Sequence, residues 1–122
     1  MNDKRKFVLP YVNEVTVIFN SSLAQRTASL TSAKEVNLCM VLNGREIHAQ
    51  RDYIHRIALA HECGHILSAR KRGDFLYKLW AAIAWIKDKY SGSKAEHEGD
   101  DHMNQHKNEY PTIYIDGTMQ YA

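Results

Sequence analysis

The sequence contains few cysteines and no long apolar segment, and both absences limit the class of protein. Its two cysteines, Cys39 and Cys63, are too few for a disulfide framework. The longest apolar run, residues 79–86, has eight residues, whereas a membrane-spanning helix needs about 20. The first residues are polar and charged and no apolar stretch follows them, so we expect no signal peptide. These features predict a cytoplasmic protein without a membrane partner.

The chain also lacks a strong excess of charge of either sign. Its formal net charge is +2 at pH 7, and 25% of its residues are charged. Basic clusters at residues 4–6 and 70–72 are typical of a solvated terminus and of the last turn of a helix. They give no clear sign of a nucleic-acid partner. With 122 residues, 44% of them hydrophobic, the sequence predicts a single domain over residues 1–122.

Alternating apolar residues and turn signals predict the strands. Val15, Val17 and Phe19 alternate with Glu14 and Thr16 in a segment rich in β-branched residues. Asn-Gly and Asp-Gly pairs favour the tight turns of hairpins, because their central residues tolerate positive φ. The predicted strands are residues 11–20, 36–42 and 45–50, with a small hairpin around Asp116-Gly117.

A helix is expected from Asp52, a plausible N-cap, to about Arg72, where Gly73 ends it. Gly64 inside this helix costs about 1 kcal/mol relative to alanine, and a close backbone approach to neighbouring strands would justify that cost. Further helices are expected over residues 75–90 and in the polar segment 94–108. The predicted fold class is α+β, with a small antiparallel or mixed sheet packed on the central helix.

The central helix carries His61-Glu62-Cys63-Gly64-His65, an H-E-x-x-H motif. Its two histidines are four residues apart, so they lie on one face of the helix and can bind one Zn²⁺. The intervening glutamate flanks the position of a metal-bound water and can accept its proton. Cys63 lies on another face and is interpreted as a packing residue. The motif predicts one zinc ion held by His61 and His65, with Glu62 as the catalytic base.

A catalytic zinc needs a third protein ligand and an open coordination position. The polar segment 94–108 supplies the candidates. Glu96 and Asp100 are four residues apart, as are Glu98 and His102, so either pair presents one ligand and one supporting group on a single helix face. Reasoning from the residues therefore leaves Glu96, Glu98 and His102 all open as the third ligand.

The chain resembles the gluzincin metallopeptidases, and most closely the ImmA/IrrE family. The likeness lies in residues 57–67, which contain H-E-x-x-H, and in Glu96-His97-Glu98-Gly99-Asp100, where that family usually has alanine in place of Gly99. The resemblance implies that Glu96 is the third ligand and that Asp100 orients a zinc-bound histidine. It also implies the zincin fold and a zinc-dependent endopeptidase activity, with a regulatory protein such as a transcriptional repressor as substrate.

Several further expectations follow for an active peptidase. The polar strand 45–50 follows an apolar one, so it is expected at a sheet edge, where an extended peptide substrate can pair with it. The oxyanion of the tetrahedral intermediate needs a hydrogen-bond donor. The candidate donors are His102, His106, Tyr110 and Tyr114.

A second hypothesis belongs to a different class. The protein would be a zincin-fold interaction module, for example phage- or plasmid-borne, in which the metal only stabilises the fold. A closed structural site wants a fourth protein ligand, which His102 would supply. An intact Glu62 favours the peptidase, since a structural site needs no base.

Overall fold

The computed structural model describes residues 3–21, 46–73, 76, 79 and 94–121, with the backbone alone for residues 94–96. The predicted strand 36–42, its Asn43-Gly44 turn and nearly all of the predicted helix 75–90 lie outside these residues. The described chain forms an α+β fold with two principal helices and two small three-stranded sheets. No helix in this part of the chain combines the length and apolar character needed to cross a membrane.

The first sheet has the strand order β1-β2-β3. Strands β1 (Asp3–Leu9) and β2 (Asn13–Phe19) form an antiparallel hairpin, in which Phe7 pairs with Val15. Strand β3 (Glu46–His48) pairs with β2 in parallel. The strand predicted over residues 11–20 is confirmed. Residues 3–9 were not among the predicted strands, and they form one because they complete the hairpin with β2.

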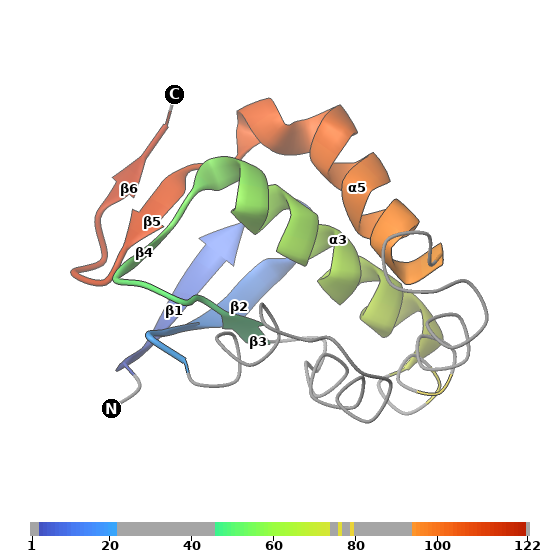
Figure 1. The fold of residues 1–122 in the computed structure, drawn as a ribbon, viewed down its shortest axis with the longest axis horizontal. Helices are drawn as coiled ribbons and strands as arrows, with labels where there is room; N and C mark the ends of the chain where they lie inside the picture. Colours follow the sequence, from blue (N-terminus) through green and yellow to red (C-terminus); the bar gives the residue numbers. More distant parts are fainter. Residues whose placement is uncertain (1–2, 22–45, 74–75, 77–78, 80–93, 122) are drawn as a thin grey trace.

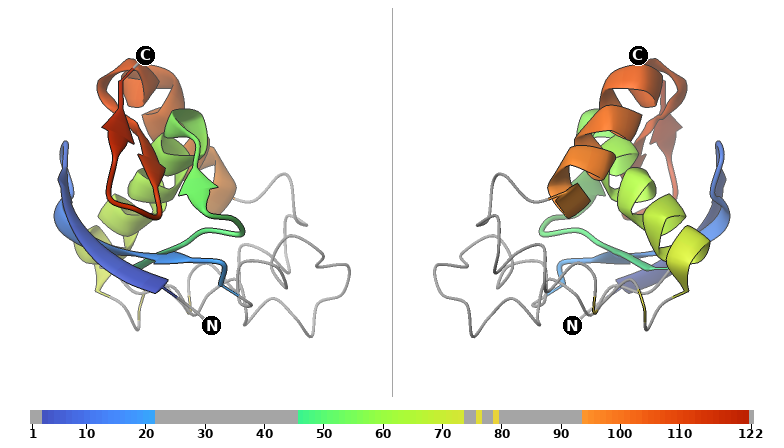
Figure 2. Two further views of the ribbon diagram at one scale, coloured as in Figure 1. Left: turned by 90° about the vertical axis from the view of Figure 1, so that its left-hand side faces the viewer. Right: turned by 90° about the vertical axis from the view of Figure 1, so that its right-hand side faces the viewer.

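The two helices pack side by side, and one of them lies against this sheet (Figures 1 and 2). Helix α3 (Arg56–Arg72) crosses between the sheet and helix α5 (Lys94–His106), with which it makes its largest interface. Leu59, Ala60, Cys63 and Ile66 of α3 are buried with the apolar residues of β2. This core holds one face of α3 in place and leaves another face to contact α5.

The second sheet has the strand order β4-β5-β6 and lies at the N-terminal end of α3 (Figure 1). Strand β4 (Tyr53–Ile54) directly precedes α3, and the turn η2 (Lys107–Glu109) leads from α5 to β5 (Thr112–Tyr114). Strand β5 pairs antiparallel with both β4 and β6 (Met119–Gln120). The hairpin predicted around Asp116-Gly117 is confirmed.

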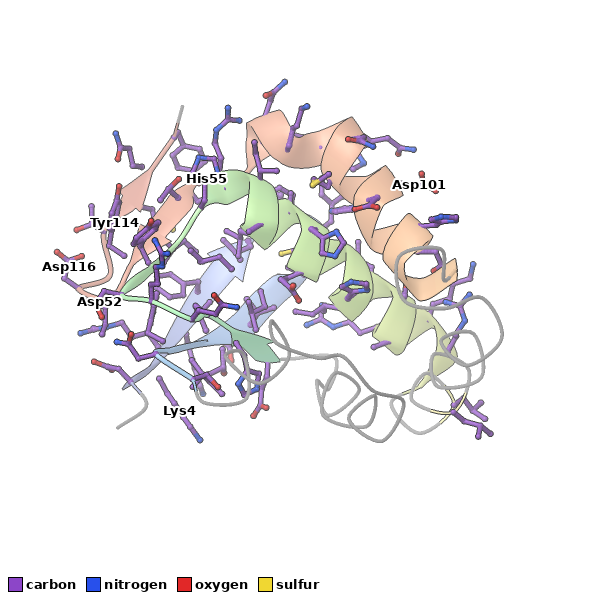
Figure 3. All side chains as sticks on the ribbon, in the orientation of Figure 1. Lys4, Asp52, His55, Asp101, Tyr114 and Asp116 are labelled. Atoms are coloured by element: carbon purple, nitrogen blue, oxygen red, sulfur yellow. The ribbon has the colours of Figure 1, made fainter. Side chains whose placement is uncertain are left out.

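The start of α3 differs from the prediction. Asp52 was expected to cap the helix, but the helix begins at Arg56 and the side chain of His55 accepts a hydrogen bond from the backbone N–H of Ile57. The carboxylate of Asp52 instead accepts a hydrogen bond from Asn20, and its carbonyl accepts one from Ile115. Figure 3 shows His55 at the start of α3 and Asp52 in the segment before it. The predicted end is confirmed, since Gly73 caps the helix with φ of +82°.

Candidate metal centre

Helix α3 brings the two histidines of the motif into direct contact. Their Nε2 atoms lie 2.9 Å apart, and the ring planes are nearly perpendicular at 87°. His65 is buried, and the side chain of His61 keeps 18% of its surface exposed. This contact follows from the i,i+4 spacing, which stacks the two residues on one face of the helix. The two nitrogens best suited to a metal therefore converge on one point.

Helix α5 supplies a carboxylate that orients one of these imidazoles. Asp100 Oδ1 lies 3.0 Å from His61 Nδ1, on the side of the ring opposite Nε2. With Nδ1–H donating to Asp100, Nε2 is the unprotonated nitrogen of a neutral His61 ring. A carboxylate behind a histidine in this way fixes the ring and its tautomer in zinc sites. Asp100 thus contacts a motif histidine, and its role in orienting a zinc ligand stays a prediction.

Gly99 allows α5 to lie directly against both imidazoles. A Cβ atom at this position would be 2.9 Å from His61 Cε1 and 3.0 Å from His65 Nε2. Its neighbour across the interface, Gly64, has a similar role, since a Cβ there would lie 3.0 Å from the Gly99 Cα. The close approach that Gly64 permits is therefore to α5 and not, as the sequence suggested, to strands.

Glu62 is half-buried on α3, one residue after His61. Its negative charge acts on His48 of β3: burial lowers the pKa of that histidine, and the carboxylates of Glu46 and Glu62 oppose the shift. This interaction places Glu62 within electrostatic range of β3. The base of the motif and the strand predicted to bind substrate are thus near one another.

The fit of a zinc ion can be judged from the histidine pair. Two nitrogens bound to one tetrahedral zinc at about 2.0–2.1 Å lie about 3.3 Å apart. The observed Nε2 separation of 2.9 Å needs only a small opening of the two rings. Among the side chains that the structure describes, no group of three or more His, Cys, Asp or Glu is arranged to hold a metal. Glu96 belongs to α5, one turn before Asp100, but its side chain lies outside the described set. The two motif nitrogens suit zinc, and the assignment of Glu96 as the third ligand stays a prediction.

The other two candidate ligands have different partners. Glu98 accepts hydrogen bonds from Ser68 Oγ at 2.5 Å and from both terminal nitrogens of Arg72, at 3.0 and 2.8 Å. Burial raises the pKa of Glu98, but Arg72 and Ser68 outweigh burial and hold it below its usual value. His102 directs Nε2 to the hydroxyl of Tyr110, 2.7 Å away. Neither side chain joins the pair formed by the motif histidines.

The candidate oxyanion donors are also engaged elsewhere. The hydroxyl of Tyr110 is buried and donates to the carbonyl of Pro10, and burial raises the pKa of this tyrosine. His106 pairs with Glu109 at 2.7 Å, and Tyr114 donates to Gln120 across the β5-β6 hairpin. Tyr114 is labelled in Figure 3, in the second sheet. The structure does not bring these three residues to the histidine pair.

The buried cysteine of the motif serves packing, as the sequence suggested. Cys63 is a fully buried residue of α3, and burial raises the pKa of its thiol to about 12. The thiol lies among the apolar side chains of the core, which is the surrounding expected of a packing residue. Two further histidines have structural contacts: His55 caps α3, and His48 Nδ1 lies 2.6 Å from Ser21 Oγ.

Three features of this interface were not predicted from the sequence: the contact of Ser68 with Glu98, the contact of Arg72 with Glu98, and the close packing of Gly99 against the histidines. A signal for the first two was present. His61, His65, Ser68 and Arg72 recur at spacings of four, three and four residues, which places them in one polar stripe along α3. That stripe faces α5, so polar residues on α5 were to be expected opposite it.

Comparisons of this chain with protein-family models, with curated proteins and with solved structures found no match.

Proposed function

We propose that the protein is a zinc-dependent endopeptidase of the zincin type, with one Zn²⁺ held by His61, His65 and Glu96. The observation that carries the proposal is the convergence of the two Nε2 atoms, with Asp100 fixed behind His61. Support also comes from the motif spacing and from the resemblance to the ImmA/IrrE family. In this pair one histidine is buried, a carboxylate contacts the other, and a glycine packs against both rings. Two histidines that met by chance on a helix surface would have none of these features.

Each residue then has a defined chemical task. When bound, zinc supplies a Lewis acid that lowers the pKa of a bound water and polarises a peptide carbonyl. Glu62 accepts the proton of the attacking water and delivers it to the leaving amine. Asp100 keeps the His61 ring in the tautomer that leaves Nε2 unprotonated. The peptide C–N bond is broken, and the products are a carboxylate and an amine.

The arrangement favours an open site over a closed structural one. A structural zinc needs four protein ligands, and His102 was the candidate for the fourth. Its Nε2 is engaged with Tyr110, and its pKa is lowered by burial and by neighbouring His106. Three protein ligands leave the fourth position for water, as peptide hydrolysis requires.

The substrate is proposed to be a protein or peptide bound in extended form along β3. Glu46 and His48 of this strand are half-buried, whereas Ile47 between them packs in the core. β3 is the last strand in the described order β1-β2-β3, and Glu62 acts electrostatically on His48. An extended chain paired there would bring its backbone past the base.

A single substitution tests the activity. Glu62→Gln keeps the size and polarity of the side chain but removes the base, so it should retain zinc and lose at least about 100-fold in cleavage of a quenched fluorogenic peptide library. Glu14→Gln is the matched control, because it removes an exposed carboxylate from the distant Lys6–Glu14 pair. Equal cleavage by the wild type and Glu62→Gln would refute the proposal.

A further inference from the structure

Two glycines lie at the centre of the contact between α3 and α5. Gly64 and Gly99 meet there, and a Cβ on either one would approach the opposite helix to about 3.0 Å or less. Ridges of side chains normally fix the angle and rotation of packed helices. Two glycines provide no ridge, so polar contacts beside the crossing gain weight in setting how α5 is rotated.

Two such contacts lie on opposite sides of Gly99. Glu98 and Asp100 are two residues apart, which separates them by about 200° around the helix axis. Asp100 reaches His61, while Glu98 is bound by Ser68 and Arg72, seven and eleven residues further along the same stripe of α3. Turning α5 in either direction would lengthen one of these two contacts. Together they define a single rotation of the helix.

The contact at Glu98 is built to hold a fixed geometry. Arg72 uses both terminal nitrogens, one to each carboxylate oxygen, and Ser68 adds a third hydrogen bond. The side chains of Arg72 and Glu98 expose only 24% and 35% of their surface. Bidentate arginine–carboxylate pairs are directional as well as strong, which suits them to fixing an orientation.

We propose that Glu98, bound by Ser68 and Arg72, is a positioning residue of the metal centre. By fixing the rotation of α5, it places Asp100 behind His61. The inference rests on the proposed zinc site. It gives Glu98 a role other than that of a ligand, and it extends the metal centre to Ser68 and Arg72.

The test compares the zinc Kd and the Co²⁺ absorption spectrum of the wild-type chain with those of its variants. Glu98→Ala should raise the Kd for zinc about tenfold or more, the scale expected when a residue that orients zinc ligands is lost. It should also shift the visible absorption of the Co²⁺-substituted protein. Both are measured at a temperature where circular dichroism shows the variants folded, with Glu14→Gln as the control. Arg72→Met and Ser68→Ala, which leave α5 unaltered, should change the Kd in the same direction.

A double-mutant cycle separates positioning from mere stability. Once Asp100→Asn has weakened the contact with His61, adding Glu98→Ala should cost clearly less in zinc affinity than it does in the wild type. Unchanged zinc Kd and Co²⁺ spectrum in folded Glu98→Ala would overturn the inference while leaving the proposed function intact.

The metal-free protein provides an independent readout. The Nδ1–H proton of His61, followed by NMR, should shift in Glu98→Ala because its bond to Asp100 is disturbed. If wild-type protein bound no zinc, the proposed function would fail, and this NMR signal would still decide whether Glu98 sets the rotation of α5. An unshifted signal would overturn the inference.

Discussion

At the scale of single residues, Gly99 sets the distance between α5 and the histidine pair. We predict that Gly99→Ala weakens zinc binding, because the added methyl carbon would lie 3.0 Å from His65 Nε2 and 2.9 Å from His61 Cε1. Overpacking of this kind costs about 1–3 kcal/mol, although alanine is the better helix former. The change is measured as the zinc Kd in a competition assay with a chromophoric chelator.

The control for this change is Gln105→Ala, an exposed position on the same helix. It alters helix propensity without approaching the histidines, so its zinc Kd should equal that of the wild type. Tighter zinc binding by Gly99→Ala would contradict the geometry of the site.

His102 provides a pH-dependent prediction. Burial, followed by the charge of His106, lowers its pKa below the usual 6.5, so the unfolded chain takes up this proton more readily than the folded one. Its contribution to stability is therefore complete above pH 6.5 and is lost as the pH falls from 6.5 through the folded-state pKa. The stability advantage of wild type over His102→Gln should shrink between pH 7.5 and pH 5, as measured by urea unfolding. An advantage that grows on acidification would show that the pKa is raised.

At the scale of elements, the crossing of α3 and α5 depends on Gly64. We predict that Gly64→Ala destabilises the fold by about 1–3 kcal/mol, because the new Cβ would lie 2.9 Å from His102 Cβ and 3.0 Å from the Gly99 Cα. This cost exceeds the gain of about 1 kcal/mol in helix propensity. Chemical denaturation gives the change in unfolding free energy. A more stable variant would mean that the helices do not meet at this point.

The sequence was most informative where a structural feature depends on neighbouring residues. The shared face of His61 and His65 follows from the helical repeat alone, and the end of α3 follows from Gly73. The start of α3 was wrong because Asp52 bonds to Asn20, 32 residues away, which no local pattern reveals. The polar stripe of α3 indicated that Ser68 and Arg72 face polar residues, but it did not identify Glu98, 30 and 26 residues later in the chain, as their partner.

At the scale of the whole molecule, one core connects both sheets to the helix that carries the motif. Val17 of β2, Ile47 of β3, Leu59 of α3 and Ile113 of β5 are fully buried in the same cluster. The α+β class was predictable from alternating strands and a long central helix. The division into two sheets, with β3 parallel to β2, was not, because strand pairing is set by contacts distant in sequence.

The most direct test of the zinc site is elemental analysis of the purified full chain after dialysis against a metal-free buffer. We predict one zinc per wild-type chain, loss of zinc in His65→Ala and in Glu96→Ala, and full retention in Glu62→Gln. Zinc absent from the wild type, or present in equal amount in His65→Ala and Glu96→Ala, would contradict the account.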